Sequence, residues 1–471
     1  MGIADTLENY FGLAEHDSDV GTETIAGVTT FLAMSYIILV NPFILADAIE
    51  ISGYSYLQVV QMIAIGTIIA SAVAIFVMAF YANRPFGLAP GMGLNVFFAY
   101  TVVIGMGIPW ETALAAVFVE GIIFIVITAI GAREYVIRLF PEPVKFSVGA
   151  GIGIFLLFIG LQEMGVVVPD EATAVALGDI ATNPAALLGL FGLFLTFVLW
   201  ARDVTGSIIL GILGTSVAGW LAYYAGLASP SSVLPTALLS DEGQLSFAVV
   251  TSPQYDISPL LFAFVDGLRD IDPFTFTLVV FTFFFVDFFD TAGTLIGVSQ
   301  FGGFLDEDGN LPDIDKPLMA DAIGTTVGAM VGTSTVTTYV ESSTGVEEGG
   351  RTGLTALVVG LLFLATLVLI PLIAMIPAYA SFIALVVVGI IMLQGVLDID
   401  WDDPAWAVSA GLTITIMPLT YSIANGLAAG IIAFPILKAA MGEFDDIRLG
   451  QWLMAVVLVG YFYVHTSGIV G

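Results

Sequence analysis

The chain has 471 residues, of which 58% are hydrophobic, and a mean hydropathy of +1.02. This composition excludes a water-soluble globular protein, in which apolar residues make up about half of the chain and fall in short periodic runs. The formal net charge of −31, from 41 acidic and 10 basic residues, argues against a nucleic-acid partner and suits a salt-rich cytoplasm, as in a halophile.

Apolar runs long enough to cross a bilayer, which takes about 17 to 25 residues, recur along almost the whole chain. The first set of predicted spans covers residues 24–46, 59–79, 88–104, 112–130, 144–161, 185–201 and 207–227. After a polar stretch, the second set covers residues 274–298, 318–331, 333–349, 354–376, 381–397, 404–417 and 423–440. A last apolar run, residues 451–464, either crosses the membrane as well or lies on its surface.

The hydropathy pattern divides the chain into five parts. These are a cytoplasmic N-terminus (1–23), seven spans (24–227), an extracellular loop (228–273), seven further spans (274–441) and a C-terminal segment (442–471). Cytoplasmic loops keep Lys and Arg, and with the N-terminus in the cytoplasm all 10 basic residues except Arg269 lie on or beside that side. Because seven is odd, the second set begins from the opposite side, so the two sets have inverted topology, as in many transporters. We therefore predict a multi-pass protein of the cell membrane.

The third span of each set is interrupted. The first reads "NRPFGLAPGMGLNVFFAY" (Asn83 to Tyr100) and the second "GTSTVTTYVESSTGVEEGG" (Gly332 to Gly350). Glycine, proline and β-branched residues disfavour a continuous helix, and irregular backbone at membrane depth must be buried in protein or line a cavity. We expect a short extended segment in each, followed by a half-helix that begins near Asn95 and near Ser342. The free N–H groups at the start of a half-helix suit polar or anionic ligand groups.

Three carboxylates stand out within these apolar spans. Glu341 lies where the second extended segment meets its half-helix, near the bilayer midplane, where an unpaired carboxylate is costly. The eighth span contains "FFFVDFFDTAGT", in which Asp287 and Asp290 lie three residues apart on one helix face. Together these side chains could accept hydrogen bonds from the N–H groups of a planar heterocycle. Burial also favours the protonated form of a carboxyl group, which lets it carry a proton.

Two other intramembrane acids are secondary candidates. Glu120, in "VFVEGIIF" of the fourth span, is either a relay or a structural hydrogen-bonding group. Asp321, in "MADAIGTT" at the start of the ninth span, is either a helix-terminal residue or a support for the site. No metal site and no cofactor are expected, because the chain has no cysteine and its two histidines, His16 and His465, are near the termini.

Four segments carry a resemblance to a known family: "APGMGLNVFFAY", "DFFDTAGTLIGV", "TYVESSTGVEEGGRTG" and "MPLTYSIANGLAAG". They resemble the nucleobase:cation symporter superfamily of xanthine/uracil permeases, in particular its azaguanine-permease-like branch of adenine, guanine and hypoxanthine permeases. The resemblance runs from about Glu23 to Lys438. It implies an all-α polytopic membrane protein with fourteen transmembrane segments in two inverted repeats and short β-strands in spans 3 and 10. It also implies a core domain of spans 1–4 and 8–11 and a gate domain of spans 5–7 and 12–14.

The same resemblance implies roles for individual residues. Family positions that contact the purine match Asn95, Asp287, Tyr339, Val340 and Glu341. Asp290 matches a neighbouring position that affects function. Relatives in the uracil branch have a histidine in the eighth span, whereas this chain offers only Asp290 there, so we assign proton coupling to Asp290 and Glu341.

The predicted function is secondary active import of purine nucleobases (hypoxanthine, guanine or adenine) by proton symport, with no enzymatic activity. The alternatives are sodium-coupled nucleobase transport and an anion transporter of the same fold, although three carboxylates in the site argue against an anion. An intramembrane hydrolase with paired aspartates would need an aspartate opposite Asp287 rather than Asn95 and Glu341. The expected partners are the purine, a proton or sodium ion, the lipid bilayer and a second copy of the chain in a homodimer.

Overall fold

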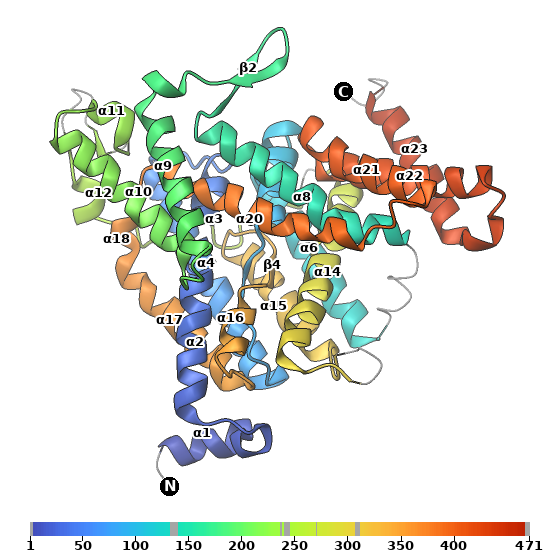
Figure 1. Ribbon diagram of the computed structural model, residues 1–471, viewed down its shortest axis with the longest axis horizontal. Helices are drawn as coiled ribbons and strands as arrows, with labels where there is room; N and C mark the ends of the chain where they lie inside the picture. Colours follow the sequence, from blue (N-terminus) through green and yellow to red (C-terminus); the bar gives the residue numbers. More distant parts are fainter. Residues whose placement is uncertain are drawn as a thin grey trace. The chain divides into compact units, whose positions relative to one another are not determined.

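The computed structural model describes residues 3–131, 140–235, 238–239, 245–269, 271–306 and 311–466 (Figure 1). These residues are mostly helical, and helical elements occupy every range that hydropathy assigned to a span. Arg133 and Arg138, which supported the predicted orientation, lie outside the described residues. The chain divides into two compact units: Met1–Ala129 with Ile159–Val387, and Ile130–Phe158 with Val388–Gly471.

Within the described part of the chain, nine helices are long and apolar enough to cross a membrane. They are Val20–Ala46, Tyr56–Ala82, Trp110–Ala129, Glu142–Glu163, Ser207–Tyr224, Pro273–Gln300, Gly353–Ile373, Ala378–Asp398 and Ile423–Ala440. Shorter apolar helices are Met92–Gly105, Pro184–Trp200, Pro404–Leu419 and Leu449–Gly460. The protein is therefore a multi-pass membrane protein, as its composition predicted.

The first unit contains most of the elements. From its N-terminal part come α1 (Ile3–Phe11), α2 (Val20–Met34), α3 (Ile37–Ala46), α4 (Tyr56–Val77), β1 (Leu88–Pro90), α5 (Met92–Val96) and α6 (Trp110–Ala129). Next come β2 (Val167–Asp170), β3 (Ala174–Leu177), α9 (Pro184–Trp200), α10 (Ser207–Tyr224), α11 (Pro230–Val233), α12 (Ala248–Thr251) and α13 (Phe264–Gly267). Last come α14 (Pro273–Gly302), α15 (Asp315–Met330), β4 (Val336–Thr338), α16 (Ser342–Glu347), α17 (Gly353–Ala365), α18 (Ile370–Ile373) and α19 (Ala378–Ser381).

The two interrupted spans meet in a short antiparallel strand pair. β1 pairs with β4 in the register Leu88↔Thr338, Ala89↔Thr337 and Pro90↔Val336, and all six residues are buried. Backbone hydrogen bonds continue the ladder on both sides, from Tyr339 N to the Gly87 carbonyl (3.0 Å) and from Gly91 N to the Thr335 carbonyl (3.0 Å). The predicted extended segments are confirmed, and they satisfy each other's backbone groups as membrane-embedded backbone requires.

The half-helices follow directly after the strands. α16 begins at Ser342, as expected, whereas α5 begins at Met92, about one turn before the expected Asn95. Gly91 lies in the extended turn between β1 and α5 and allows this turn to approach β4 closely, because a Cβ there would lie 2.6 Å from the Thr337 side chain. The third predicted span then continues beyond α5 as a π-helix, Phe97–Gly105.

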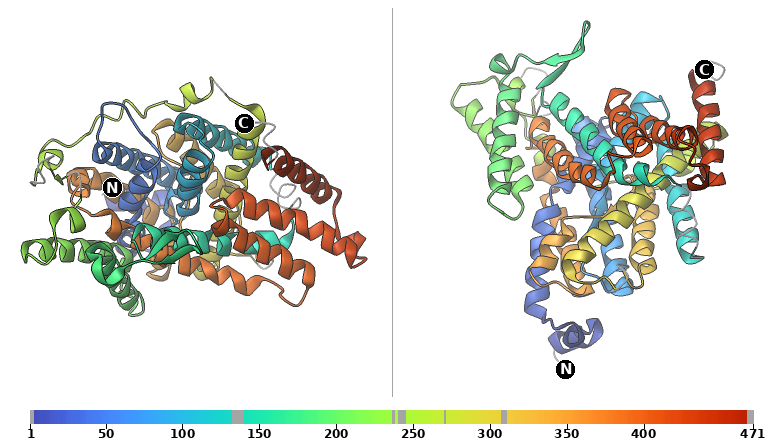
Figure 2. Two further views of the ribbon diagram at one scale, coloured as in Figure 1. Left: turned by 90° about the horizontal axis from the view of Figure 1, so that it is seen from above. Right: turned by 45° about the vertical axis from the view of Figure 1, so that its right-hand side comes forward.

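Two long helices pack on β4, and a third helix packs on both of them. α6 packs on α14 and α15, and both of these contact β4 (Figures 1 and 2). Gly121 allows α6 to approach α15 closely, because a Cβ at this position would lie 2.9 Å from the backbone nitrogen of Thr326. The long helix α14 is capped at its start by Asp272, whose carboxylate accepts the Thr275 N–H, and ends at Gly303 with φ of 65°.

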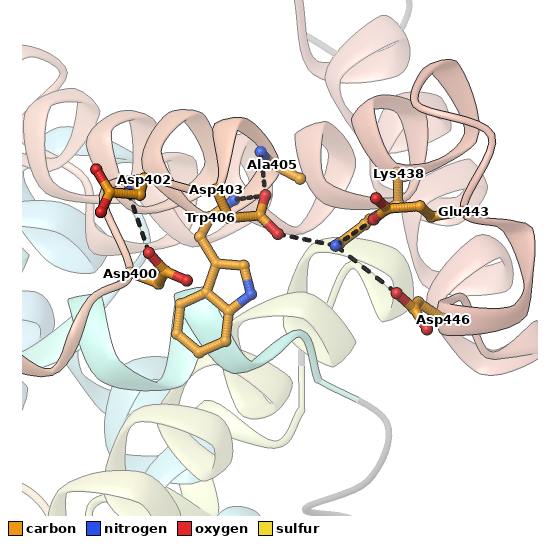
Figure 3. Close-up of polar contacts among 8 residues, drawn as sticks. All are labelled: Asp400, Asp402, Asp403, Ala405, Trp406, Lys438, Glu443 and Asp446. Carbon is orange, nitrogen blue, oxygen red and sulfur yellow. Dashed lines mark hydrogen bonds and ion pairs between the residues drawn. The ribbon is translucent and has the colours of Figure 1, made fainter.

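The second unit contains parts of α8 (Glu142–Glu163) and α20 (Ile383–Met392), together with α21 (Pro404–Leu419), α22 (Ile423–Ala440) and α23 (Leu449–Thr466). Near the C-terminal end of α22, the Lys438 ammonium contacts Asp403 (2.9 Å), Glu443 (2.5 Å) and Asp446 (3.7 Å) (Figure 3). Asp403 also caps α21 by accepting the backbone N–H of Ala405 at 2.7 Å. One buried lysine thus joins the start of α21 to the end of α22.

Candidate functional site

The predicted site residues all lie in the first unit, around the β1–β4 pair. Glu341 lies between β4 and α16, directly before Ser342, and its Oε1 accepts a hydrogen bond from the Tyr36 hydroxyl of the α2–α3 segment at 2.7 Å. Tyr339 donates its hydroxyl to the Pro90 carbonyl at 2.6 Å, so it ties the end of β4 to β1. The rings of Tyr36 and Tyr339 lie 6.5 Å apart, and together they hold the Glu341 carboxylate on one side of the strand pair.

One face of this site is accessible. The Val340 side chain is 47% exposed, and Glu341 and Asp290 are partly exposed. Asp290 on α14 interacts electrostatically with Glu341 and takes a hydrogen bond from the Thr337 side chain of β4. The accessible face therefore presents two carboxylates from different elements beside an apolar side chain, an arrangement that can accept hydrogen bonds from N–H groups at the edge of a flat apolar ring.

Asp287 and Asp290 both lie on α14, but their side chains have different neighbours. Asp287 is fully buried, and its carboxyl group contacts those of Glu120 on α6 and Asp321 on α15. Asp321 Oδ2 accepts a 2.6 Å hydrogen bond from the Thr291 hydroxyl and a 3.1 Å hydrogen bond from the Thr338 N–H. Because α15 begins at Asp315, Asp321 is not a terminal residue of its helix, and its carboxylate supports β4 instead.

Asn95 connects the two halves of the chain behind the site. It lies in α5, is fully buried, and accepts a short hydrogen bond from the hydroxyl of Ser334, just before β4. Its side-chain nitrogen donates to the Pro90 carbonyl at 3.4 Å. The predicted residues thus form an accessible group (Asp290, Val340 and Glu341), the buried Tyr339 beside it, and a second buried group (Asn95, Glu120, Asp287 and Asp321).

Several polar partners were not predicted from the sequence. Tyr36 holds Glu341, Ser334 holds Asn95, and Thr291 and Thr337 share a 2.6 Å hydrogen bond between the buried and accessible carboxylates. Tyr36 was detectable in principle as a polar ring in the apolar run "MSYIIL". Thr291 gives a weaker signal, because a hydroxyl inside a membrane helix usually bonds to the backbone of its own helix.

Comparison with known proteins identifies the chain. The family model Xan_ur_permease, described as the permease family, matches residues 21–429. The chain belongs to this family of permeases. Members are transporters and not enzymes, as predicted for this chain. The adenine permease AdeP of Escherichia coli is 36% identical to the permease over 96% of this chain and 95% of that protein.

The chain is also similar to a second permease and to a transporter of known structure. The guanine/hypoxanthine permease PbuO of Bacillus subtilis is 39% identical over 93% of this chain and 96% of that protein. Among solved structures, the transmembrane domain of the cyanobacterial bicarbonate transporter BicA matches with a TM-score of 0.56 and 15% identity, over 88% of this permease and 97% of that domain. At 15% identity, the similarity to the BicA domain concerns the fold alone.

Proposed function

We propose that the permease imports purine nucleobases, with hypoxanthine, guanine and adenine as the candidate substrates. The observation that carries this proposal is the accessible pair Asp290 and Glu341 beside Val340, in a chain whose relatives at 36% and 39% identity are named for adenine and for guanine and hypoxanthine. Purines present N–H groups at their edges and apolar faces, and the site offers acceptors and an apolar contact at one face.

In this proposal, Glu341 accepts hydrogen bonds from the purine, Val340 and the Tyr339 backbone line its ring, and Asp290 acts in proton coupling together with Glu341. The contacts of Asn95 and Asp287 with the purine stay predictions, because both side chains are fully buried behind this face. Asp321 supports the site through the Thr338 backbone, and Glu120 lies against Asp287.

The proposed architecture has fourteen spans in two inverted repeats, with a core domain that moves against a gate domain to alternate access. The β1–β4 pair supports the repeat arrangement, because it joins the third span of each set. In this arrangement the N-terminus (1–23) is cytoplasmic, the repeats cover 24–227 and 274–441, and 228–273 is extracellular. Homodimer formation stays a prediction, and the acidic charge supports a salt-rich cytoplasm.

We propose a proton as the coupling ion, because a proton needs only one carboxylate in a low-dielectric setting, whereas sodium needs several converging oxygens. Sodium is the alternative, with hydroxyls of residues 333–338 as ligands. An anion substrate is disfavoured by the acidic face formed by Asp290 and Glu341. The similarity to a bicarbonate transporter concerns the fold and says nothing about the substrate.

Radiolabelled uptake tests the function directly. Cells that lack their own purine permeases are expected to accumulate labelled hypoxanthine, guanine or adenine when they express this chain, and not labelled bicarbonate or sulfate. Cells that carry the empty vector are the control, and expression is checked at the membrane. Uptake of the anions without any purine uptake would replace the proposal with the anion transporter.

The proposed orientation gives a second expected result. The chain has no cysteine, so single cysteines can be introduced without a background. A cysteine at Asp306 is expected to react with a membrane-impermeant thiol reagent only from the cytoplasmic side, and one at Ser231 only from outside. Both positions are exposed. Labelling with the sides exchanged would invert the topology.

A further inference from the structure

A buried cluster of acids lies behind the accessible face. Glu120, Asp287 and Asp321 come from α6, α14 and α15, and all three are fully buried. Every charged partner of this cluster among the described residues is acidic, since Asp287 and Asp321 also interact with Asp290, which in turn interacts with Glu341. Three ionised carboxylates without a cation are very costly in such surroundings. The cluster therefore has to carry protons.

The hydrogen bonds indicate where a proton is missing. Asp321 Oδ2 receives two donors, the Thr291 hydroxyl and the Thr338 N–H, so this oxygen is satisfied in the ionised form. Both oxygens of Glu120, Oδ2 of Asp287 and Oδ1 of Asp321 are buried without a hydrogen-bond partner. Nevertheless, the Glu120 and Asp287 carboxyl groups are in side-chain contact. Two buried carboxyl groups in contact can satisfy each other by a hydrogen bond only if one of them holds a proton.

A chain of hydroxyls leads from this pair toward the accessible face. Asp290 takes a hydrogen bond from the Thr337 side chain. The Thr337 hydroxyl lies 2.6 Å from that of Thr291, and the Thr291 hydroxyl lies 3.5 Å from Asp287 Oδ1. Each hydroxyl has one hydrogen, so Thr291 donates either to Asp321 or to Asp287, and Thr337 donates to Thr291 when a protonated Asp290 donates to Thr337. The partly exposed carboxylate is therefore connected to the buried pair through two side chains.

We propose that Glu120 and Asp287 share the transported proton, and that Asp290 delivers it through the hydroxyls of Thr337 and Thr291. This inference rests on the proposed proton symport and gives the proton a site. In the forward step, the Thr291 hydroxyl first turns its hydrogen from Asp321 to Asp287. Asp290 then gives its proton to the Thr337 oxygen, Thr337 gives its own hydroxyl hydrogen to Thr291, and Thr291 gives its hydrogen to Asp287. One proton leaves Asp290, one arrives at the Glu120–Asp287 pair, and both threonines are hydroxyls again.

The surroundings favour a proton over a larger cation. Gly121, next to Glu120, packs so closely on α15 that a Cβ would lie 2.6 Å from the Thr326 hydroxyl oxygen. A sodium ion needs a shell of several oxygens around it, whereas a shared proton needs two. Glu120 contributes to transport here as a proton-holding group and does not touch the purine.

The first test uses Glu120→Gln in proteoliposomes. Glutamine keeps the shape of a protonated glutamate but cannot release the proton. Accumulation of labelled purine driven by an imposed pH gradient is expected to fall by about tenfold or more, while exchange of purine without a gradient stays within about twofold of the unsubstituted protein. The matched control is Glu111→Gln in the first turn of the same helix, which should leave both measurements unchanged. Gradient-driven accumulation by Glu120→Gln at the original level would overturn the proposal.

A second measurement is independent of transport. Infrared spectra of the purified permease at neutral pH are expected to contain the C=O band of a protonated carboxyl group, and Glu120→Gln should remove it, whereas Glu111→Gln should not. If the permease moves no purine but has this band, the proposed function fails and the shared proton stands. A spectrum without a Glu120-dependent band means that the pair holds no proton, and the inference is then wrong.

The relay is tested through Thr291. Thr291→Val keeps the shape and removes the hydroxyl, so pH-driven accumulation is expected to slow by about tenfold, while Thr291→Ser, which keeps the hydroxyl, should restore it. If Thr291→Val and Thr291→Ser are equally slow, the defect is one of packing and the hydroxyl path is refuted. If Thr291→Val transports like the unsubstituted protein, the proton does not use this path.

Discussion

Glutamine in place of Glu341 is expected to lower purine binding by more than about tenfold, while the permease still reaches the membrane. The substitution keeps the size of the side chain and the capacity to accept from Tyr36, but it removes the charge and replaces one acceptor oxygen with a donor. Hydrogen bonds to a charged group are worth about 1.5–3 kcal/mol, and about 1.4 kcal/mol corresponds to a tenfold change in affinity. Equilibrium binding of labelled hypoxanthine to the purified permease measures the effect.

The control for this experiment is Glu347→Gln. Glu347 lies in the same short helix, α16, but is exposed and carries no role in the proposed site. Its substitution should leave purine affinity unchanged. Binding by Glu341→Gln at the affinity of the unsubstituted protein would mean that the purine binds elsewhere.

Asparagine in place of Asp290 is expected to abolish pH-driven accumulation of purine and to preserve purine exchange. Exchange returns a loaded carrier and needs no release of the proton, whereas net accumulation needs a group that takes up and releases one in each cycle. Asp290 is suited to this task because it lies beside Glu341 and is hydrogen-bonded to Thr337. Proteoliposomes with an imposed pH gradient, and separately with an imposed sodium gradient at matched ionic strength, measure accumulation.

The two gradients also decide the coupling ion. Accumulation driven by sodium alone and indifferent to pH would replace the proton with sodium. The control is Asp306→Asn, since Asp306 is an exposed acid outside the proposed site, and this variant should accumulate purine normally. Loss of both accumulation and exchange in Asp290→Asn would assign this residue to purine binding instead of coupling.

The extended segments could be predicted from the sequence because their residues carry the signal themselves. Glycine and proline around Leu88–Pro90 and β-branched residues in Val336–Thr338 disfavour helix at membrane depth, and both segments are strands. The partner and the register could not be derived in this way. They depend on contacts between distant parts of the chain, such as the hydrogen bond from Gly87 N to the Ser342 hydroxyl.

The sequence indicated the carboxylates of the candidate site, but it did not predict which of them lie next to one another. A spacing of three placed Asp287 and Asp290 together on α14, yet in a helix of 3.6 residues per turn such residues differ by about 60° in direction. This angle is enough for Asp287 to face α6 and α15 while Asp290 faces Glu341. Which neighbour occupies each direction is decided by the packing of α14, and helix periodicity carries no information about it.

The strand pair also has a consequence for synthesis of the protein. Because β1 precedes β4 by most of the length of the first unit, the ribosome completes the first seven predicted spans well before the partner of β1 exists. Until Val336–Thr338 is made, the backbone groups of Leu88–Pro90 that face β4 have no strand to pair with, and a lipid environment offers them no substitute. The third predicted span therefore reaches its final conformation only after translation has passed residue 338.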